Sequence, residues 1–172
     1  MTLLILGLVL WTAAHLFKRV APAARASMQD RLGDGSKGVI ALVLVASVVL
    51  MVIGYRAADT SFIWGRSAAT TGINNRLMLV AVALFGVGNS KSRLRAKFRH
   101  PMLWGTFIWA ASHLLVNGDT ASLVLFGWIG IWALVEMQMI NRAEPDYVPY
   151  EGGSAAGDVR LFIITLVLYG VI

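Results

Sequence analysis

Long apolar segments alternate with short polar or basic connections along the whole chain. A bilayer core about 30 Å thick needs roughly 20 mostly apolar residues per helix, and fewer where flanking Lys and Arg reach the headgroups. Six segments qualify, some of them short: Thr2 to Phe17, Gly38 to Tyr55, Gly72 to Val87, Pro101 to Val116, Ala121 to Ile140 and Val159 to Ile172. The pattern predicts an all-α polytopic membrane helix bundle with about six transmembrane helices.

The connections between these segments are too short to hold a soluble domain, so we expect residues 1–172 to form a single transmembrane domain. The first segment has no basic residue before it and no small-residue cleavage site, and we expect it to be retained as a span. Hydrophobic residues make up 58% of the chain and charged residues 14%, in agreement with a membrane protein. The chain has no Cys, which excludes disulfides, thiolate ligands and covalent c-type haem attachment.

Basic residues predict the orientation in the membrane. They concentrate in the first and third connections: Lys18, Arg19, Arg25, Arg31 and Lys37, then Lys91, Arg93, Arg95, Lys97 and Arg99. The positive-inside rule places both connections in the cytoplasm, and the N-terminus outside. The net charge of +6 therefore reflects topology and contact with membrane lipids, and we expect no nucleic-acid partner.

Two five-residue motifs nearly repeat each other. Trp11 and His15 begin and end Trp-Thr-Ala-Ala-His, and Trp109 and His113 begin and end Trp-Ala-Ala-Ser-His. In a helix, the Trp and His of each motif lie on one face, and the small residues between them leave room for a flat ligand. The motifs lie in the first and fourth spans, which cross in opposite directions, so an inverted repeat of three plus three helices is possible.

Two imidazoles in apolar helices can hold a haem iron between them. Ionisable side chains inside a bilayer are costly and are usually functional, although interhelical hydrogen bonding is the alternative role for His15 and His113. Their backbones differ in depth by about 13 Å, and both Cα–Cβ bonds lean toward the midplane. Helix tilt can close the rest of this difference in depth. Zinc fits less well, because a structural site needs four ligands and the chain has three His and no Cys.

Arg99 and His100 begin the fourth span and leave two roles open. They either form a polar start signal at the headgroups or bind an anion such as a haem propionate or a phosphate. His100 and His113 point about 220° apart around a helix and cannot readily share a metal, whereas His100 and His15 are an alternative pair at the cytoplasmic interface. Glu136 could be a proton relay, a propionate partner or a snorkelling side chain. Asn74 and Asn75 are expected to mark the entry of the third span.

The ordered motifs of the chain resemble the NnrU family of bacterial membrane proteins. The resemblance lies in six stretches: Leu8 to Arg19, Val52 to Arg56, Trp64 to Arg66, Gly72 to Asn75, Arg99 to Met102 and His113 to Asp119. It implies a place in the bacterial inner membrane and a link to nitrite and nitric oxide reduction in denitrification. Relatives include the 15-cis-ζ-carotene isomerase, which implies haem b held by His15 and His113.

The chain departs from that isomerase at one position. The resemblance implies a Cys three residues before the second histidine that takes part in redox-dependent ligation, and Ala110 stands there. Thiolate exchange is therefore impossible, and isomerase activity is not simply inherited. The pattern from Arg99 to Gly105 is also similar to the start of isoprenylcysteine-type membrane methyltransferases, but the other motifs have no counterpart there.

Three functions remain at this point. The first is a haem b enzyme, an isomerase or oxidoreductase, acting on an apolar substrate dissolved in the membrane. The second is a non-enzymatic electron-transfer or nitric-oxide-responsive haem protein with a redox partner. The third is a methyltransferase without haem. In the first two, Trp11, Trp109, Arg99 and His100 join the two axial histidines around the cofactor, and whether the chain is an enzyme stays open.

Overall fold

The computed structural model describes residues 1–172, and seven α-helices account for most of them. They are α1 (Thr2–Val20), α2 (Pro22–Leu32), α3 (Gly35–Arg56), α4 (Ala68–Asn89), α5 (Pro101–Val116), α6 (Thr120–Ala143) and α7 (Ala155–Val171). A 3₁₀ helix, η1 (Arg93–Lys97), and two short strands, β1 (Phe62–Trp64) and β2 (Gly118–Asp119), complete the chain. The expected all-α bundle is therefore confirmed.

Four helices are long and apolar enough to cross a membrane: α1, α3, α4 and α6. Helix α5 is apolar but has 16 residues, and α7 has 17. Each of the six predicted segments falls largely within one of these six helices, and the prediction for α5 matches at both ends. The model thus supports a membrane protein with four helices of spanning length, while six crossings and the inverted repeat remain predictions.

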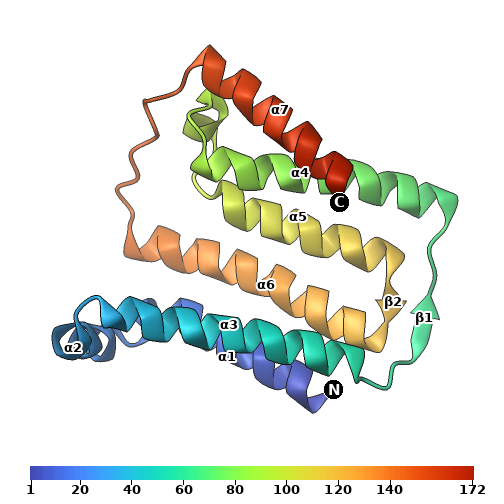
Figure 1. Cartoon of the computed structure of the whole chain (residues 1–172), viewed down its shortest axis with the longest axis horizontal. Helices are drawn as coiled ribbons and strands as arrows, with labels where there is room; N and C mark the ends of the chain where they lie inside the picture. Colours follow the sequence, from blue (N-terminus) through green and yellow to red (C-terminus); the bar gives the residue numbers. More distant parts are fainter.

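The helices lie side by side in one broad layer that is thickened by α1 behind α3 (Figure 1). Helix α6 packs against α1 and α5, α5 packs against α4, and α4 packs against α7. Figure 1 shows α2 and η1 at the same end of the layer, so both basic connections lie together there, as expected. We call this the basic end and the opposite end, where β1 and β2 lie, the strand end. Helix α1 runs toward the basic end and α5 away from it, so the two Trp-x-x-x-His motifs are antiparallel.

Helix α2 was not expected from the apolar pattern, because it carries no apolar face. Pro22 occupies its first turn, where a missing N–H is tolerated, and Gly33 ends it with φ +54°, a conformation that favours glycine.

Helix α4 begins earlier than expected. Ser67 caps it, accepting a hydrogen bond from the Thr70 N–H at 3.1 Å. Asn74 and Asn75 therefore lie inside the helix, and their expected role at its entry was wrong.

The strand end ties two connections together. Strand β1 pairs antiparallel with β2, and the Trp64 indole N–H donates to the Leu114 carbonyl at 3.0 Å. Asp119 then caps α6 by accepting a hydrogen bond from the Ser122 N–H at 2.9 Å. These contacts fix the start of α6 beside the end of α5.

Apolar side chains such as Leu4, Leu8 and Trp132 share the interior with small polar residues, while many other large apolar side chains face outward. The fully buried polar residues are all serines: Ser36, Ser47, Ser92, Ser112 and Ser122. Leu42 and Ile131, in contrast, are 70% and 65% exposed, respectively. This distribution suits a bundle surrounded by lipid, where close packing of small residues holds the helices together and the outer surface must be apolar.

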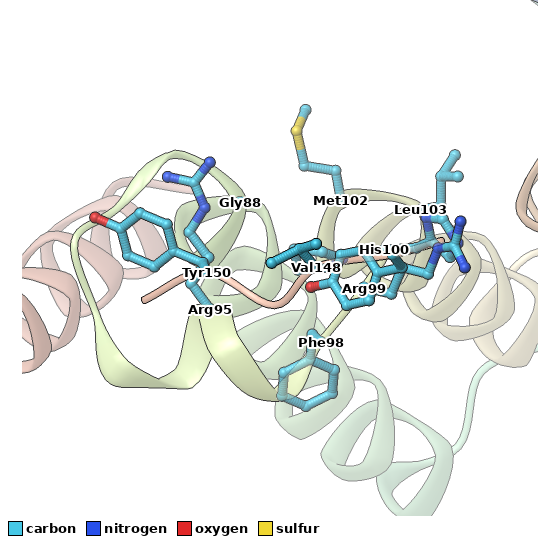
Figure 2. Close-up of a pocket in the computed structure, with 11 residues that line it drawn as sticks. Gly88, Arg95, Phe98, Arg99, His100, Met102, Leu103, Val148 and Tyr150 are labelled. Carbon is cyan, nitrogen blue, oxygen red and sulfur yellow. The ribbon is translucent and has the colours of Figure 1, made fainter. Parts of the chain in front are cut away.

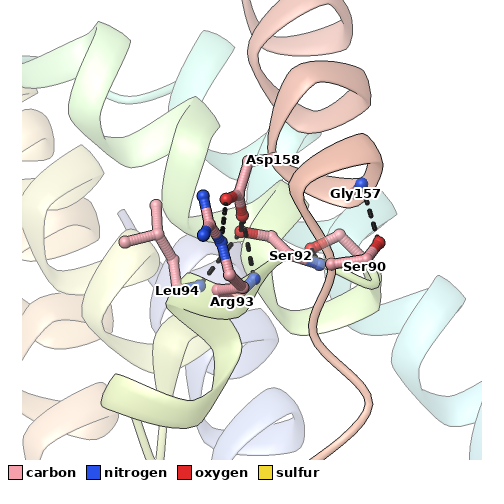
Figure 3. Close-up of polar contacts among 7 residues, drawn as sticks. Ser90, Ser92, Arg93, Leu94, Gly157 and Asp158 are labelled. Atoms are coloured by element: carbon pink, nitrogen blue, oxygen red, sulfur yellow. Dashed lines mark hydrogen bonds and ion pairs between the residues drawn. The ribbon is translucent and has the colours of Figure 1, made fainter.

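Helix α7 is anchored to the connection between α4 and α5 through Asp158 (Figure 3). Its carboxylate accepts hydrogen bonds from the Ser92 hydroxyl at 2.7 Å, the Arg93 backbone N–H at 2.8 Å and the Arg93 side chain at 2.6 Å. The hydrogen bond from Ser92, helped by those from Arg93, lowers the pKa of Asp158 below its ordinary value of 3.8. The carboxylate is therefore charged at neutral pH, and it holds the start of α7 against η1.

Helices α1 and α3 approach so closely that Gly54 cannot carry a side chain. A Cβ at Gly54 would collide with the backbone of Leu3 and Leu4 in α1. We predict that Gly54→Ala lowers the stability of the detergent-purified protein by about 1–3 kcal/mol, measured as thermal unfolding by tryptophan fluorescence. Gly72→Ala in α4 is the control, because its Cβ would meet open space. A Gly54→Ala protein as stable as the control would contradict this close contact.

Candidate functional site

The first Trp-x-x-x-His motif packs against α6. The ring centroids of Trp11 and His15 are 4.2 Å apart on α1. Both rings contact Trp132 of α6 edge-on, with centroid distances of 5.3 Å from Trp11 and 4.7 Å from His15. The four-residue spacing of the motif therefore places an aromatic cluster between α1 and α6.

The second motif has the same internal arrangement on α5. The centroids of Trp109 and His113 are 4.8 Å apart, and both rings contact Phe126 of α6, at 5.2 and 4.7 Å. The two motifs thus share one geometry and one neighbouring helix.

Both motif histidines are held in the tautomer that can bind a metal. The Nδ1 atom of His15 lies 2.9 Å from the Trp11 carbonyl oxygen, and that of His113 lies 2.9 Å from the Trp109 carbonyl oxygen. A carbonyl only accepts, so Nδ1 carries the proton in each ring and Nε2 carries the lone pair. A directed Nδ1–H with a free Nε2 is the arrangement that fixes metal-binding histidines.

The two imidazoles do not meet across the bundle, because they contact α6 at different points. Their neighbours Trp132 and Phe126 are six residues apart, which is about 9 Å along the axis and about 120° around it. Both motifs therefore contact α6, at separate places along it and around it.

A buried ion pair that we did not expect from the sequence extends the His15 cluster. Arg19 continues the spacing of Trp11 and His15 in the last turn of α1, and its Nη1 lies 2.8 Å from Oε1 of Glu136. Glu136 follows Trp132 by one turn of α6. His15 and Arg19 of α1 therefore face Trp132 and Glu136 of α6 across the same interface. The basic pattern of the sequence places Arg19 in the connection after the first span. The four-residue spacing of positions 11, 15 and 19 indicates instead that Arg19 lies on the same helix face as Trp11 and His15.

The polar atoms around His15 lack partners. Four buried side-chain nitrogen or oxygen atoms have no hydrogen bond: Trp11 Nε1, Arg19 Nε, Trp132 Nε1 and Glu136 Oε2. Two of them belong to Trp11 and Trp132, whose rings contact His15, and two belong to the Arg19–Glu136 pair, one helical turn further along. Buried polar groups are nearly always satisfied in folded proteins, and a cluster of exceptions points to an additional polar group or water at that place. Three of these atoms are N–H donors, beside a free imidazole, and they are suited to an acidic group that accepts hydrogen bonds; the Glu136 Oε2 atom is an acceptor and needs a separate donor such as water.

An apolar groove of about 590 Å³ runs beside the motifs and is lined by both motif tryptophans. The other walls come from α3, α4 and α6, and include Met51, Tyr55, Phe85, Phe126 and Ile129. Neither motif histidine is part of its lining. The groove can therefore accept an apolar molecule next to the motifs without displacing either imidazole.

His113 borders a second cavity, of about 420 Å³, at the strand end. Asn74, Asn75, Asn117 and Tyr169 also line it. The two asparagines that we had expected to start the third span therefore supply amide groups on the side of His113 that faces α4 and α7.

Arg99 and His100 lie apart from both motifs, at the basic end (Figure 2). The Nε2 atom of His100 lies 2.8 Å from Oδ1 of Asn141, so Nε2 is occupied, unlike that of His15 or His113. Asn141 follows Trp132 by nine residues, about 13 Å along α6 and on its opposite face. The model does not bring His100 next to His15.

Comparison with curated proteins and with solved structures gives no match. The model of one protein family, described as NnrU protein, matches residues 3–172, which is essentially the whole chain. The resemblance seen in the motifs therefore holds across all the helices, and the chain belongs to the NnrU family.

Proposed function

We propose that this membrane protein binds one haem b, with His15 and His113 as axial ligands, and acts on an apolar substrate that enters from the bilayer. The observation that carries the proposal is the set of four unpaired buried polar atoms around His15, whose own Nε2 is free. The acidic side groups of a porphyrin would match the three N–H groups of this set, and Glu136 Oε2 would take a separate donor such as water. The porphyrin would place an iron near Nε2, and a propionate would accept a hydrogen bond from Arg19.

His15 is the better supported of the two ligands, and His113 is the weaker one. Trp11 and Trp132 hold the His15 ring from two sides, and the unpaired atoms gather around it. His113 has the same tautomer but packs against another turn of α6, and no unpaired buried polar atom lies on its neighbours Trp109 and Phe126. We therefore propose that His15 would hold the haem more firmly and that His113 would be the weaker ligand.

The groove supports an enzyme more than a simple electron carrier. Haem iron supplies redox or Lewis-acid chemistry when one coordination position is open. The chain contributes an apolar groove lined by Trp11 and Trp109, which excludes water and orients a long hydrocarbon beside the motifs. Electron transfer with two fixed ligands, or a response to nitric oxide in denitrification, is the alternative function. It does not account for a groove of this size.

We also propose six membrane crossings, with the N-terminus outside the bacterial inner membrane. Helices α5 and α7 would span about 24 and 26 Å at 1.5 Å per residue. Arg99, just before α5, and Arg160, in the second turn of α7, can reach the headgroups. Both helices lie alongside α4 in Figure 1. The gathering of both basic connections at one end supports a cytoplasmic position for that end.

The presence of the cofactor can be tested directly. The protein purified from haem-replete cells should carry non-covalent haem b, with a six-coordinate low-spin spectrum after dithionite reduction. Acid acetone should extract the haem, because the chain has no Cys to anchor it. A colourless preparation that takes up no added hemin would contradict the proposal and favour the methyltransferase alternative.

Histidine variants test the ligands. We expect His15→Ala and His113→Ala each to abolish the low-spin spectrum, because each removes a free Nε2. His100→Ala is the matched control and should remain low-spin, since its Nε2 already donates to Asn141. Added imidazole should restore the low-spin spectrum of a folded His15→Ala protein. A His100→Ala protein that turns high-spin while His113→Ala stays low-spin would instead identify the alternative pair.

Ligand lability separates the enzyme from the electron carrier. We predict that the reduced protein binds carbon monoxide or nitric oxide within seconds and shifts its Soret band, because His113 is the weaker ligand and leaves. The His113→Ala protein should bind carbon monoxide faster still. A wild-type spectrum that stays unchanged under saturating amounts of both gases would exclude the enzymatic and gas-responsive functions and leave electron transfer.

A further inference from the structure

A third pocket, of about 460 Å³, opens at the basic end, and neither motif histidine lines it. It lies where the connection between α4 and α5, the first turn of α5 and the segment 147–150 meet (Figure 2). Arg95 and Tyr150 form one side, and Arg99 and His100 form the other. We propose that this pocket binds the phosphate group of an anionic phospholipid.

Two arginines are oriented toward a ligand by stacking on tyrosines. The guanidinium carbon of Arg95 lies 4.4 Å from the ring centre of Tyr150, and that of Arg99 lies 5.0 Å from the ring centre of Tyr147. Stacking uses the flat face of a guanidinium and leaves the N–H groups at its edge available. Each arginine gives one hydrogen bond to the protein, to the carbonyls of Ser90 and Glu144, respectively, and several N–H groups of each remain free.

The positive charge in the pocket is not neutralised by the protein. The three ion pairs of the structure involve Arg19, Lys37 and Arg93, and neither Arg95 nor Arg99 takes part in one. The segment after α6 carries Glu144, Asp146 and Glu151, yet none forms an ion pair with these arginines. Two half-buried, unpaired guanidiniums on opposite sides of the pocket make it positively charged, and either one offers a planar fork of N–H groups that fits phosphate oxygens.

The surroundings of the pocket favour a lipid over a soluble phosphate. Phe98, Met102 and Val148 line it and are 37%, 49% and 76% exposed, respectively. The apolar run of α5 begins at Pro101, so the arginines lie at headgroup depth and the exposed apolar side chains lie where an acyl chain would start. A phospholipid would satisfy both parts, whereas inorganic phosphate would leave the apolar part uncovered.

The test compares two double variants with the same loss of charge. Arg95→Gln/Arg99→Gln removes the two stacked arginines. Lys91→Gln/Lys97→Gln removes two exposed lysines from the same connection that do not line the pocket. Binding of dioctanoyl phosphatidylglycerol, dioctanoyl phosphatidylcholine and inorganic phosphate to the detergent-purified chain is measured by native mass spectrometry and by the shift in Tm.

We expect the wild type to prefer phosphatidylglycerol over both other probes by tenfold or more. The arginine variant should lose tenfold or more of this affinity, and the lysine control less than twofold. Equal losses of phosphatidylglycerol affinity in both variants would mean that only the overall surface charge matters, and would overturn the proposal. Equal binding of phosphatidylcholine would overturn it as well, and equal binding of inorganic phosphate would identify a soluble ligand instead.

Arg95→Lys/Arg99→Lys covers the case in which the glutamine variant does not fold. It keeps the charge but loses the planar fork, and we expect at least a fivefold loss of phosphatidylglycerol affinity. Wild-type affinity in this variant would overturn the role of the stacked guanidiniums. The haem spectrum is measured on the same samples. Because neither arginine contacts His15 or His113, we expect it to stay unchanged, so that a loss of lipid binding and a failure of the cofactor proposal are told apart.

Discussion

Helix α6 lies between the two helices that carry the Trp-x-x-x-His motifs, and its aromatic side chains hold both motifs in place. Trp132 contacts the first motif and Phe126 the second. Because these residues are about 120° apart on one helix, the motifs must approach α6 from different sides. The start of α6 is in turn fixed by the cap at Asp119 and by the pairing of β1 with β2. A small change in the rotation of this helix would therefore move both histidines.

The Arg19–Glu136 pair is hard to explain as a stabilising contact alone. Removing two charges from water costs more than a single hydrogen-bonded contact normally returns, and one atom of each side chain remains without a partner. The bundle could bury apolar residues at these positions at lower cost. The pair lies one helical turn from His15 and Trp132, whose surroundings are also incompletely satisfied. An acceptor bound at this place would satisfy the three unpaired N–H groups, and a donor such as water would satisfy Glu136 Oε2, which is the basis of the cofactor proposal.

The sequence predicted the features that depend on one helix or one connection at a time. The apolar segments, the gathering of basic connections at one end and the opposite directions of the motifs follow from local composition and from counting spans. The Arg19–Glu136 contact was missed because it joins residues 117 positions apart. Its prediction requires the rotation of α6 about its axis, and apolar periodicity is weak in a helix that lipid and protein both surround. The cap at Ser67 was missed for a local reason: the apolar run starts several residues after the helix does.

The separation of His15 from His113 across α6 also bears on how the site would work. Helices α1 and α3 are in backbone contact near Gly54, so α1 cannot move alone without breaking a tight interface. Helix α5 meets α6 around Gly130, where a Cβ would come no closer than 3.5 Å to the Ala110 side chain. Helix α5 is packed tightly on its other side, however, because a Cβ at Gly105 would lie 3.1 Å from the Ala81 carbonyl oxygen of α4. Both motif helices are therefore held by a close neighbour on the side away from α6, and a group bound by both histidines would have to fit the spacing that these two interfaces set.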